Sequence, residues 1–141
     1  MKKFASGLLA LTLVLGISTS AFAAVYQEYE PNNSWADANS FYPAHGNQLN
    51  GKLDRDNGDS QDRFTFTATQ NQKIRFQLTY SKAGGQQFFL KFKNGASTTA
   101  TKDYVDIDVV AGKEYAFEVY GETFNYDYKK FDYSFYSYIL N

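Results

Sequence analysis

Residues 73–80, KIRFQLTY, decide the fold class of this chain because polar and apolar side chains alternate at every position. Ile74, Phe76, Leu78 and Tyr80 form one face of the stretch, and polar side chains form the other. A period of two is typical of a β-strand that is buried on one face only. The stretch therefore predicts an amphipathic strand at the surface of a sheet.

The same alternation recurs along most of the chain. It covers residues 63–68, 88–92, 105–109, 115–119 and 131–140, and residues 48–53 predict a further short strand. Polar or glycine-containing turns separate these stretches, and no long amphipathic helix or internal repeat interrupts them. Seven or eight short strands with turns every ~8–12 residues are typical of an antiparallel β-sandwich. In such a fold two sheets bury their apolar faces against each other.

The first 23 residues have the pattern of a secretory signal peptide. Lys2 and Lys3 precede an apolar run from Leu8 to Ile17, and Ala21-Phe22-Ala23 supplies a small-x-small cleavage pattern. The run is shorter than the ~20 residues that cross a bilayer. We expect cleavage after Ala23 and a secreted, extracellular protein of bacterial type, with residues 24–141 forming a single domain and no membrane attachment in the mature form.

Composition argues against several classes of function. Without Lys2 and Lys3, twelve of the 14 Lys+Arg remain against 15 Asp+Glu, a net charge of about −3 that disfavours nucleic acid and anionic membranes as partners. The chain has no cysteine and one histidine, His45, so it lacks the ligands of a zinc site. No nucleophile motif accompanies His45. We therefore expect a protein that is not an enzyme.

The segment Glu28-Tyr29-Glu30-Pro31-Asn32-Asn33 concentrates two carboxylates and two amides in six residues. Oxygen donors of these kinds bind calcium, but the same residues also form ordinary polar turns. The acidic loop at residues 54–59 fails the EF-hand register, because Asp59 falls where that motif needs glycine. A discontinuous calcium site remains possible, in which residues 28–33 meet Asp59 and Asp62.

Three motifs together resemble the bacterial pre-peptidase C-terminal domain, the family to which the collagen-binding domains of clostridial collagenases are related. They are Glu28-x-Glu30-Pro31-Asn32-Asn33-Ser34, then Gly51-Lys52-Leu53, then Asp59-x-x-Asp62-x-Phe64-x-Phe66. Residues 109–119 are similar to a second turn-and-strand signature of that family. The resemblance covers nearly all of residues 24–141.

The resemblance implies a jelly-roll-like β-sandwich with a calcium-binding N-terminal segment. The family's ligand positions correspond here to Glu28, Glu30, Asn32, Asn33, Asp59 and Asp62. Its collagen-binding members use tyrosines on one sheet face. Four tyrosines of this chain fall on the outward side of their expected strands, where they either bind a ligand or pack on their neighbours: Tyr104, Tyr120, Tyr136 and Tyr138.

We therefore predict a secreted, non-enzymatic binding module with a calcium-stabilised N-terminal segment. Its aromatic sheet face would bind an extracellular protein or polysaccharide. The expected module follows the leader directly, and no catalytic domain accompanies it. An alternative is a secreted inhibitor or chaperone that acts with a protease.

Overall fold

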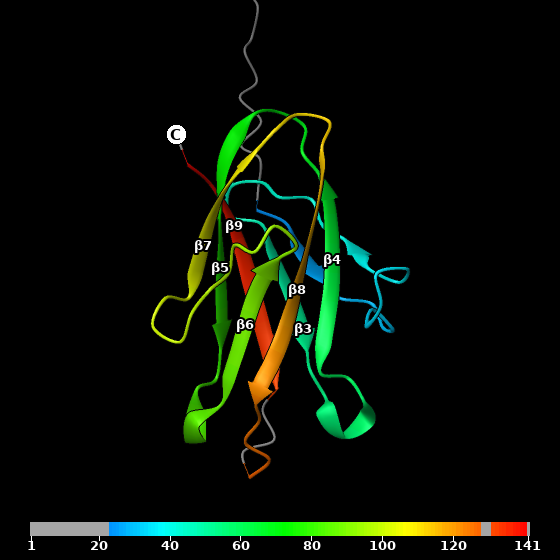
Figure 1. The fold of residues 1–141 in the computed structure, drawn as a ribbon, viewed down its shortest axis with the longest axis vertical. Coiled ribbons are helices and arrows are strands. Elements are labelled where there is room, and N and C mark those ends of the chain that lie inside the picture. Colours follow the sequence, from blue (N-terminus) through cyan, green and yellow to red (C-terminus); the bar gives the residue numbers. More distant parts are fainter. Residues whose placement is uncertain (1–22, 128–130, 141) are drawn as a thin grey trace, which may run out of the picture.

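Two β-sheets packed face to face make up the computed structural model, which describes residues 23–127 and 131–140 (Figure 1). Sheet A has the order β1 (Val25–Gln27), β3 (Gln48–Lys52), β9 (Asp132–Leu140), β5 (Gln72–Tyr80), β7 (Tyr104–Val109). Sheet B has the order β2 (Asn39–Ser40), β4 (Gln61–Thr67), β8 (Glu114–Thr123), β6 (Gln87–Phe92). Helix within these residues is limited to two 3-10 turns, η1 (Arg55–Asn57) and η2 (Ala83–Gly85). The predicted all-β sandwich is confirmed.

The first four strands alternate between the two sheets, and this makes two of the strand pairs parallel. β1 pairs with β3 in sheet A, and β2 pairs with β4 in sheet B, both in parallel register. The other strand pairs are antiparallel, as predicted. A parallel pair needs a crossover connection, which here is the excursion to the opposite sheet. β1 and β2 contain only three and two residues, too few to show a period of two in the sequence.

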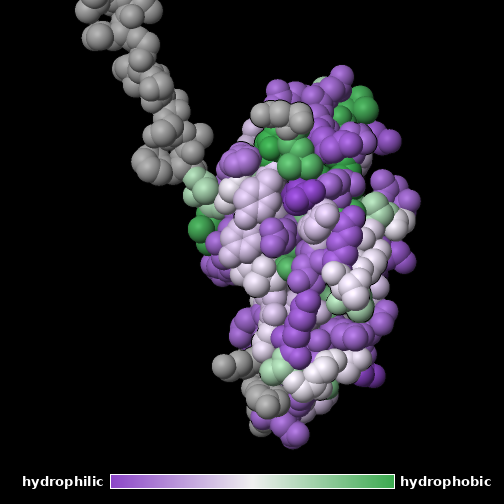
Figure 2. All heavy atoms as spheres, turned by 90° about the vertical axis from the view of Figure 1, so that its left-hand side faces the viewer, coloured by the Kyte–Doolittle hydropathy of each residue, from purple (hydrophilic) through white to green (hydrophobic). Residues whose placement is uncertain are grey.

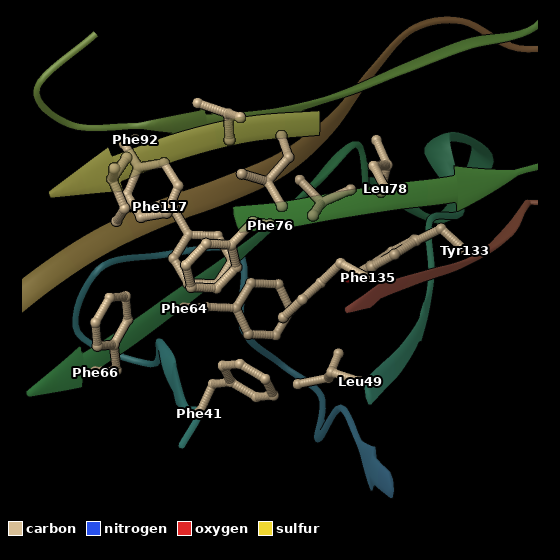
Figure 3. Close-up of a cluster of buried hydrophobic side chains, with 14 of the residues drawn as sticks. Phe41, Leu49, Phe64, Phe66, Phe76, Leu78, Phe92, Phe117, Tyr133 and Phe135 are labelled. Atoms are coloured by element: carbon tan, nitrogen blue, oxygen red, sulfur yellow. The ribbon is translucent and has the colours of Figure 1, made fainter. Parts of the chain in front are cut away.

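The amphipathic strand at residues 73–80 forms β5, in the interior of sheet A between β9 and β7. Its residues Ile74, Phe76 and Leu78 are buried as the alternation predicts. Phe76 meets Phe117 of the opposite sheet at a ring-centroid distance of 5.3 Å, and Phe117 meets Phe135 at 5.2 Å (Figure 3). These rings join the two sheets into one core, and aromatic pairs at such distances stabilise it beyond the area they bury.

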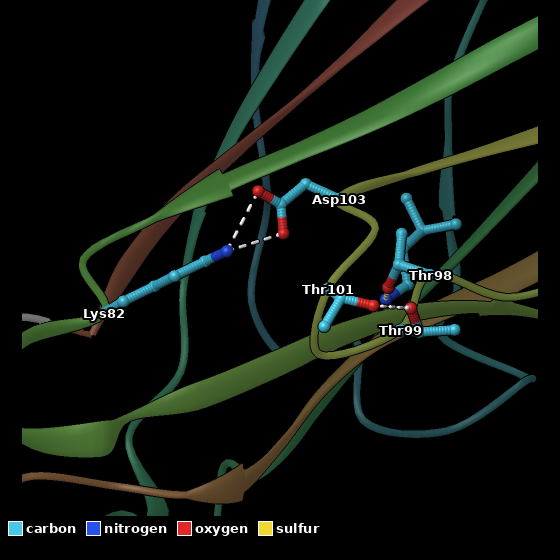
Figure 4. A network of polar contacts seen from close by, with 6 residues as sticks. Lys82, Thr98, Thr99, Thr101 and Asp103 are labelled. Atoms are coloured by element: carbon cyan, nitrogen blue, oxygen red, sulfur yellow. Dashed lines mark hydrogen bonds and ion pairs between the residues drawn. The ribbon is translucent and has the colours of Figure 1, made fainter.

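The loops beside β5 and β7 are tied together by an ion pair. Lys82 Nζ lies 2.7 and 2.9 Å from the two carboxylate oxygens of Asp103 (Figure 4). Next to this pair, the Thr98 hydroxyl accepts a hydrogen bond from Leu90 N at 3.0 Å, and Thr98 N donates to Leu90 O. The segment that follows Asn94 and Gly95 therefore covers the edge of β6 with isolated bridges and does not form a full strand.

Parts of the sequence-based prediction fall outside the described residues. The predicted leader is residues 1–23, of which only Ala23 is described, so its cleavage and the secretion of the protein stay predictions. Residues 121–130, which lie between two of the predicted strands, are described only through Asp127, and β8 extends to Thr123. Within the part of the chain that is described, no helix has the length and hydropathy needed to span a membrane.

Candidate metal centre

The N-terminal segment is fixed at the end of sheet A by backbone and side-chain contacts of Glu28. Beyond the last residue of β1, Glu28 N donates to Asn50 O at 3.0 Å. The Glu28 carboxylate accepts a short hydrogen bond from the backbone N–H of Lys52. Both partners belong to β3, so the parallel β1–β3 pair determines where this carboxylate lies.

Asp62 brings a carboxylate into the interior from the other sheet. It is the second residue of β4, and its side chain points to the same face as Phe64 and Phe66. Side chains two positions apart on a strand share a face. Asp62 is fully buried, where a charged group is costly unless it is paired or bound to a metal.

Three carboxylates converge at this point. Glu28, Glu30 and Asp62 each offer one oxygen, and these three atoms lie within 4.8 Å of one another. Glu28 is half-buried and Glu30 is exposed, so the cluster extends from the interior to the surface. The fold thus brings Asp62 into one group with Glu28 and Glu30, although they are 32 or more positions apart in the sequence.

The amides of Asn32 and Asn33 complete the cluster. Asn32 is fully buried, and in the orientation that satisfies its neighbours its amide nitrogen donates to Glu30 Oε2 at 3.1 Å and to Asp62 Oδ1 at 2.9 Å. The amide nitrogen of Asn33 likewise donates to Asp59 Oδ1 at 2.8 Å and to Gln61 O at 2.7 Å. An amide oxygen turned to the same place would face only other oxygens, so it would need a cation among them to offset the repulsion.

Tyr133 of β9 lies beneath the carboxylates. Its hydroxyl is 2.5 Å from Asp62 Oδ2 and 3.0 Å from Glu28 Oε2. Burial, and then the negative charge of Asp62 and Glu28, raise the pKa of Tyr133 well above its ordinary value, so the hydroxyl keeps its proton. One hydroxyl proton can be donated to only one carboxylate at a time.

Gly51 makes room for this arrangement. A Cβ atom at position 51 would lie 2.3 Å from the Tyr133 hydroxyl and 2.6 Å from Glu28 Oε2. Both distances are shorter than van der Waals contact. A side chain at this position would therefore displace the tyrosine or the glutamate.

Burial and mutual repulsion raise the pKa values of the carboxyl groups. Burial is the larger cause for Asp59, whose pKa rises to about 7, with the charge of Glu30 as the second cause. The pKa of Asp62 is raised further, by burial and then by the charge of Glu28. The pKa of Glu28 is raised chiefly by burial. Without a cation the cluster therefore retains protons at neutral pH.

The donor set fits a hard divalent cation. Carboxylate and amide oxygens are what calcium binds, in sets of six to eight that include backbone carbonyls and water. Of the six residues predicted as ligands, Glu28, Glu30, Asn32 and Asp62 meet directly. Asp59 joins them through its contact with Asn33. Calcium bound there would neutralise carboxylates that otherwise repel one another.

The four predicted binding tyrosines divide between the two sheets. Tyr104 and Tyr136 both pair in register with Gln77, so they share a row on the outer face of sheet A. Tyr138 is next to Tyr136 on that face, with ring centroids 6.4 Å apart and planes 15° apart. Tyr120 lies on the outer face of sheet B and packs on Phe89 at 5.6 Å. The structure brings three of the four together.

Several residues of these sites were not foreseen from the sequence. Tyr133 was expected only as an inward-facing residue of the last strand, and Gly51 only as part of a family motif. His45 is exposed and packs edge-on against Tyr138 at 5.7 Å, so it belongs to the outer face of sheet A. The parity of the last strand does place Tyr133 inside, but no pattern in the sequence indicates its carboxylate partners.

Comparison with known proteins yields fold neighbours and no family. No family model matches the sequence, and no curated protein matches it. The pre-peptidase C-terminal domain of a collagenase from Bacillus anthracis is 18% identical over 71% of this chain and 93% of that domain, with a TM-score of 0.47. PliG, a periplasmic inhibitor of g-type lysozyme from Aeromonas hydrophila, is 13% identical over 84% of this chain and all of that chain, also with a TM-score of 0.47. These are similarities of fold alone, and the roles proposed below rest on this chain's own residues.

Proposed function

We propose that this chain is a secreted, non-enzymatic binding module whose N-terminal segment is held in place by calcium. The observation that carries the calcium site is the convergence of oxygens from two sheets. Carboxylates of Glu28, Glu30 and Asp62 lie within 4.8 Å of one another, and the amide of the buried Asn32 lies 2.9 Å from Asp62 Oδ1. The residues present are oxygen donors, the kind that calcium prefers.

Calcium would act as a staple in a protein that has no disulfide. Residues 28–33 enter the fold at an edge of sheet A, whereas Asp62 is in β4 of sheet B and Asp59 lies just before that strand. An ion held by both groups would join the chain entry to both sheets. Modules outside the cell bind calcium with Kd values of roughly 10⁻⁴–10⁻³ M, matching the millimolar concentration there.

The outer face of sheet A is the proposed binding surface. Three half-buried tyrosines lie there: Tyr104, Tyr136 and Tyr138. Gln77 of β5 lies between Tyr104 and Tyr136 and pairs in register with both. The side of the molecule that bears β7 and β5 is mostly hydrophilic, with hydrophobic residues in small patches (Figure 2). Tyrosines give a large contact area with few rotatable bonds, which suits an extracellular protein or polysaccharide partner.

Thermal unfolding with and without calcium tests the metal site. Protein stripped with chelator should melt at a lower temperature than protein with calcium at about a hundredfold excess over Kd, where binding stabilises by about 2.7 kcal/mol. For a domain of this size the shift is on the order of 10 °C. Magnesium, which demands a smaller octahedral site, is the control. An unchanged midpoint together with no calorimetric binding signal would remove calcium from this function.

A further inference from the structure

Trp35, the only tryptophan of the sequence, lies two residues beyond the amides of the metal centre. Its ring is flanked by two cations on the outer face of sheet B. The Arg63 guanidinium carbon is 4.8 Å from the ring centroid, and Lys93 Nζ is 3.9 Å from it. Arg63 belongs to β4 and Lys93 directly follows β6, with β8 between these strands, so the ring extends across the sheet.

Arg63 also holds the backbone of both asparagines. Its backbone N–H donates to Asn32 O at 3.0 Å, and its Nη1 donates to Asn33 O at 2.8 Å. The guanidinium also forms an ion pair with Glu118 on β8, with Nε 3.5 Å from Glu118 Oε2. Arg63 therefore contacts the N-terminal segment at three points: its backbone N–H meets Asn32, and its guanidinium meets the Asn33 backbone and the Trp35 ring.

Arg63 directly follows Asp62 in β4, so the two side chains contact the N-terminal segment from opposite sides. Adjacent residues of a strand point to opposite faces. Asp62 reaches the carboxylate cluster inside, while Arg63 grips the outside of the segment that supplies the amides. A single dipeptide of β4 thus holds the segment from both sides.

We propose that Arg63 is a positioning residue of the metal centre, which it serves by clamping Asn33 and Trp35 onto sheet B with its guanidinium. This inference rests on the proposed calcium site. A planar guanidinium can donate to a carbonyl, face a carboxylate and stack on an indole at once, and a lysine ammonium cannot reproduce that geometry. Outer-shell groups of this kind typically change metal affinity by ~10–100-fold.

Position and charge have opposite effects here, which makes the inference testable. Arg63 is a cation near the cluster, so losing its charge alone should strengthen calcium binding. Losing the clamp should weaken binding, because the ion must then order the segment itself. Arg63→Lys keeps the charge and loses the clamp, whereas Arg63→Met loses both.

The experiment is a calcium titration of the full mature protein, followed by amide NMR shifts and by Trp35 emission. We expect Arg63→Lys to weaken calcium binding about tenfold or more, the lower end of outer-shell effects. Its ion-free Trp35 emission should shift to longer wavelength, since the ring loses a packed neighbour. Lys91→Met is the matched control: Lys91 lies on the same outer face, in register with Glu118, and should leave affinity unchanged.

Each outcome has a defined meaning. Wild-type affinity in Arg63→Lys, or tighter binding in Arg63→Met, would overturn the clamp and leave the calcium site standing. If the wild-type protein bound no calcium, the proposed function would fail instead. Amide hydrogen exchange of residues 30–35 in the ion-free proteins would then still show whether Arg63 holds this segment in place. Faster exchange in Arg63→Lys than in Lys91→Met supports it, and equal exchange rejects it.

Discussion

The hydroxyl of Tyr133 on β9 lies 2.5 Å from the carboxylate of Asp62 on β4, which places a hydrogen bond between the two sheets at one end of the sandwich. The two residues are 71 positions apart in the chain. Glu28 shares the same hydroxyl at 3.0 Å, so the N-terminal segment joins this contact. The cluster is therefore a structural junction as well as a candidate ion site.

Asp62→Asn should abolish the calcium response without lowering the stability of the ion-free protein. The pKa of Asp62 is raised by burial and by Glu28, so the ion-free protein already holds this group neutral, and an amide has nearly the shape of the protonated acid. Melting curves with chelator and with calcium measure both effects. Asp108→Asn, an exposed residue of β7, is the control and should keep the full calcium shift. A normal calcium shift in Asp62→Asn would contradict the site.

Tyr133→Phe should destabilise the ion-free protein by roughly 1–3 kcal/mol, the usual cost of leaving a buried acceptor without its donor. The ring keeps its place in the core, so a packing defect does not contribute. Chemical denaturation in the presence of chelator gives this difference. Tyr26→Phe serves as a control, because it removes a hydroxyl from a partly buried ring without a carboxylate partner among the described contacts. Equal losses in both variants would show that the contact with Asp62 contributes nothing particular.

The stability of the ion-free protein should fall as pH rises from about 5 to 8. The folded-state pKa of Asp59 is about 7 and that of Asp62 is higher, both above the ordinary value of about 4. The folded protein therefore binds more protons than the unfolded chain between these values, and unfolding becomes easier as they dissociate. The hydrogen bond with Arg75 holds the pKa of Asp106 below its ordinary value. This group therefore makes the folded protein less stable as pH falls below about 4.

Calcium should remove this pH dependence, because the ion replaces protons at the same oxygens. Melting temperatures across the pH range, with chelator and with saturating calcium, make the comparison. We expect the two curves to approach each other near pH 5 and to separate toward pH 8. A chelated protein that gains stability over that range would show that the carboxyl groups are ionised without the ion.

Substitution of the sheet A tyrosines should weaken ligand binding, and substitution of Tyr120 should not. Tyr136→Ser and Tyr138→Ser each remove a ring from the proposed surface, and loss of an anchoring aromatic commonly costs about 2 kcal/mol or more of binding energy. Pull-downs with collagen, chitin, cellulose and peptidoglycan would identify the partner class. Tyr120→Ser, on the opposite sheet, tests whether that sheet contributes. Undiminished binding by both sheet A variants would exclude this face.

Local pattern was sufficient for the longer strands and for part of the composition of the site. The alternation at residues 73–80 predicts β5 and its buried residues, because a half-buried strand needs one apolar face. The same parity that buries Phe64 and Phe66 also turns Asp62 inward. The crowding of oxygen donors at residues 28–33 is visible in the sequence and indicates one half of the candidate site.

Only the tertiary structure decided which of these groups meet. Glu28 and Tyr133 are 105 residues apart, and their contact depends on β1 and β9 flanking β3 in one sheet. Tyr120 has the same local pattern as Tyr136 but belongs to the other sheet, and Arg63 donates to the carbonyl of Asn33, 30 positions away in the chain. Side-chain alternation reports the face of a strand and says nothing of its neighbours. The neighbours of a strand are selected by how the sheets pair and pack. The longer strands could therefore be predicted from the sequence, whereas the contacts of Asp62 with Tyr133 and Glu28 could not.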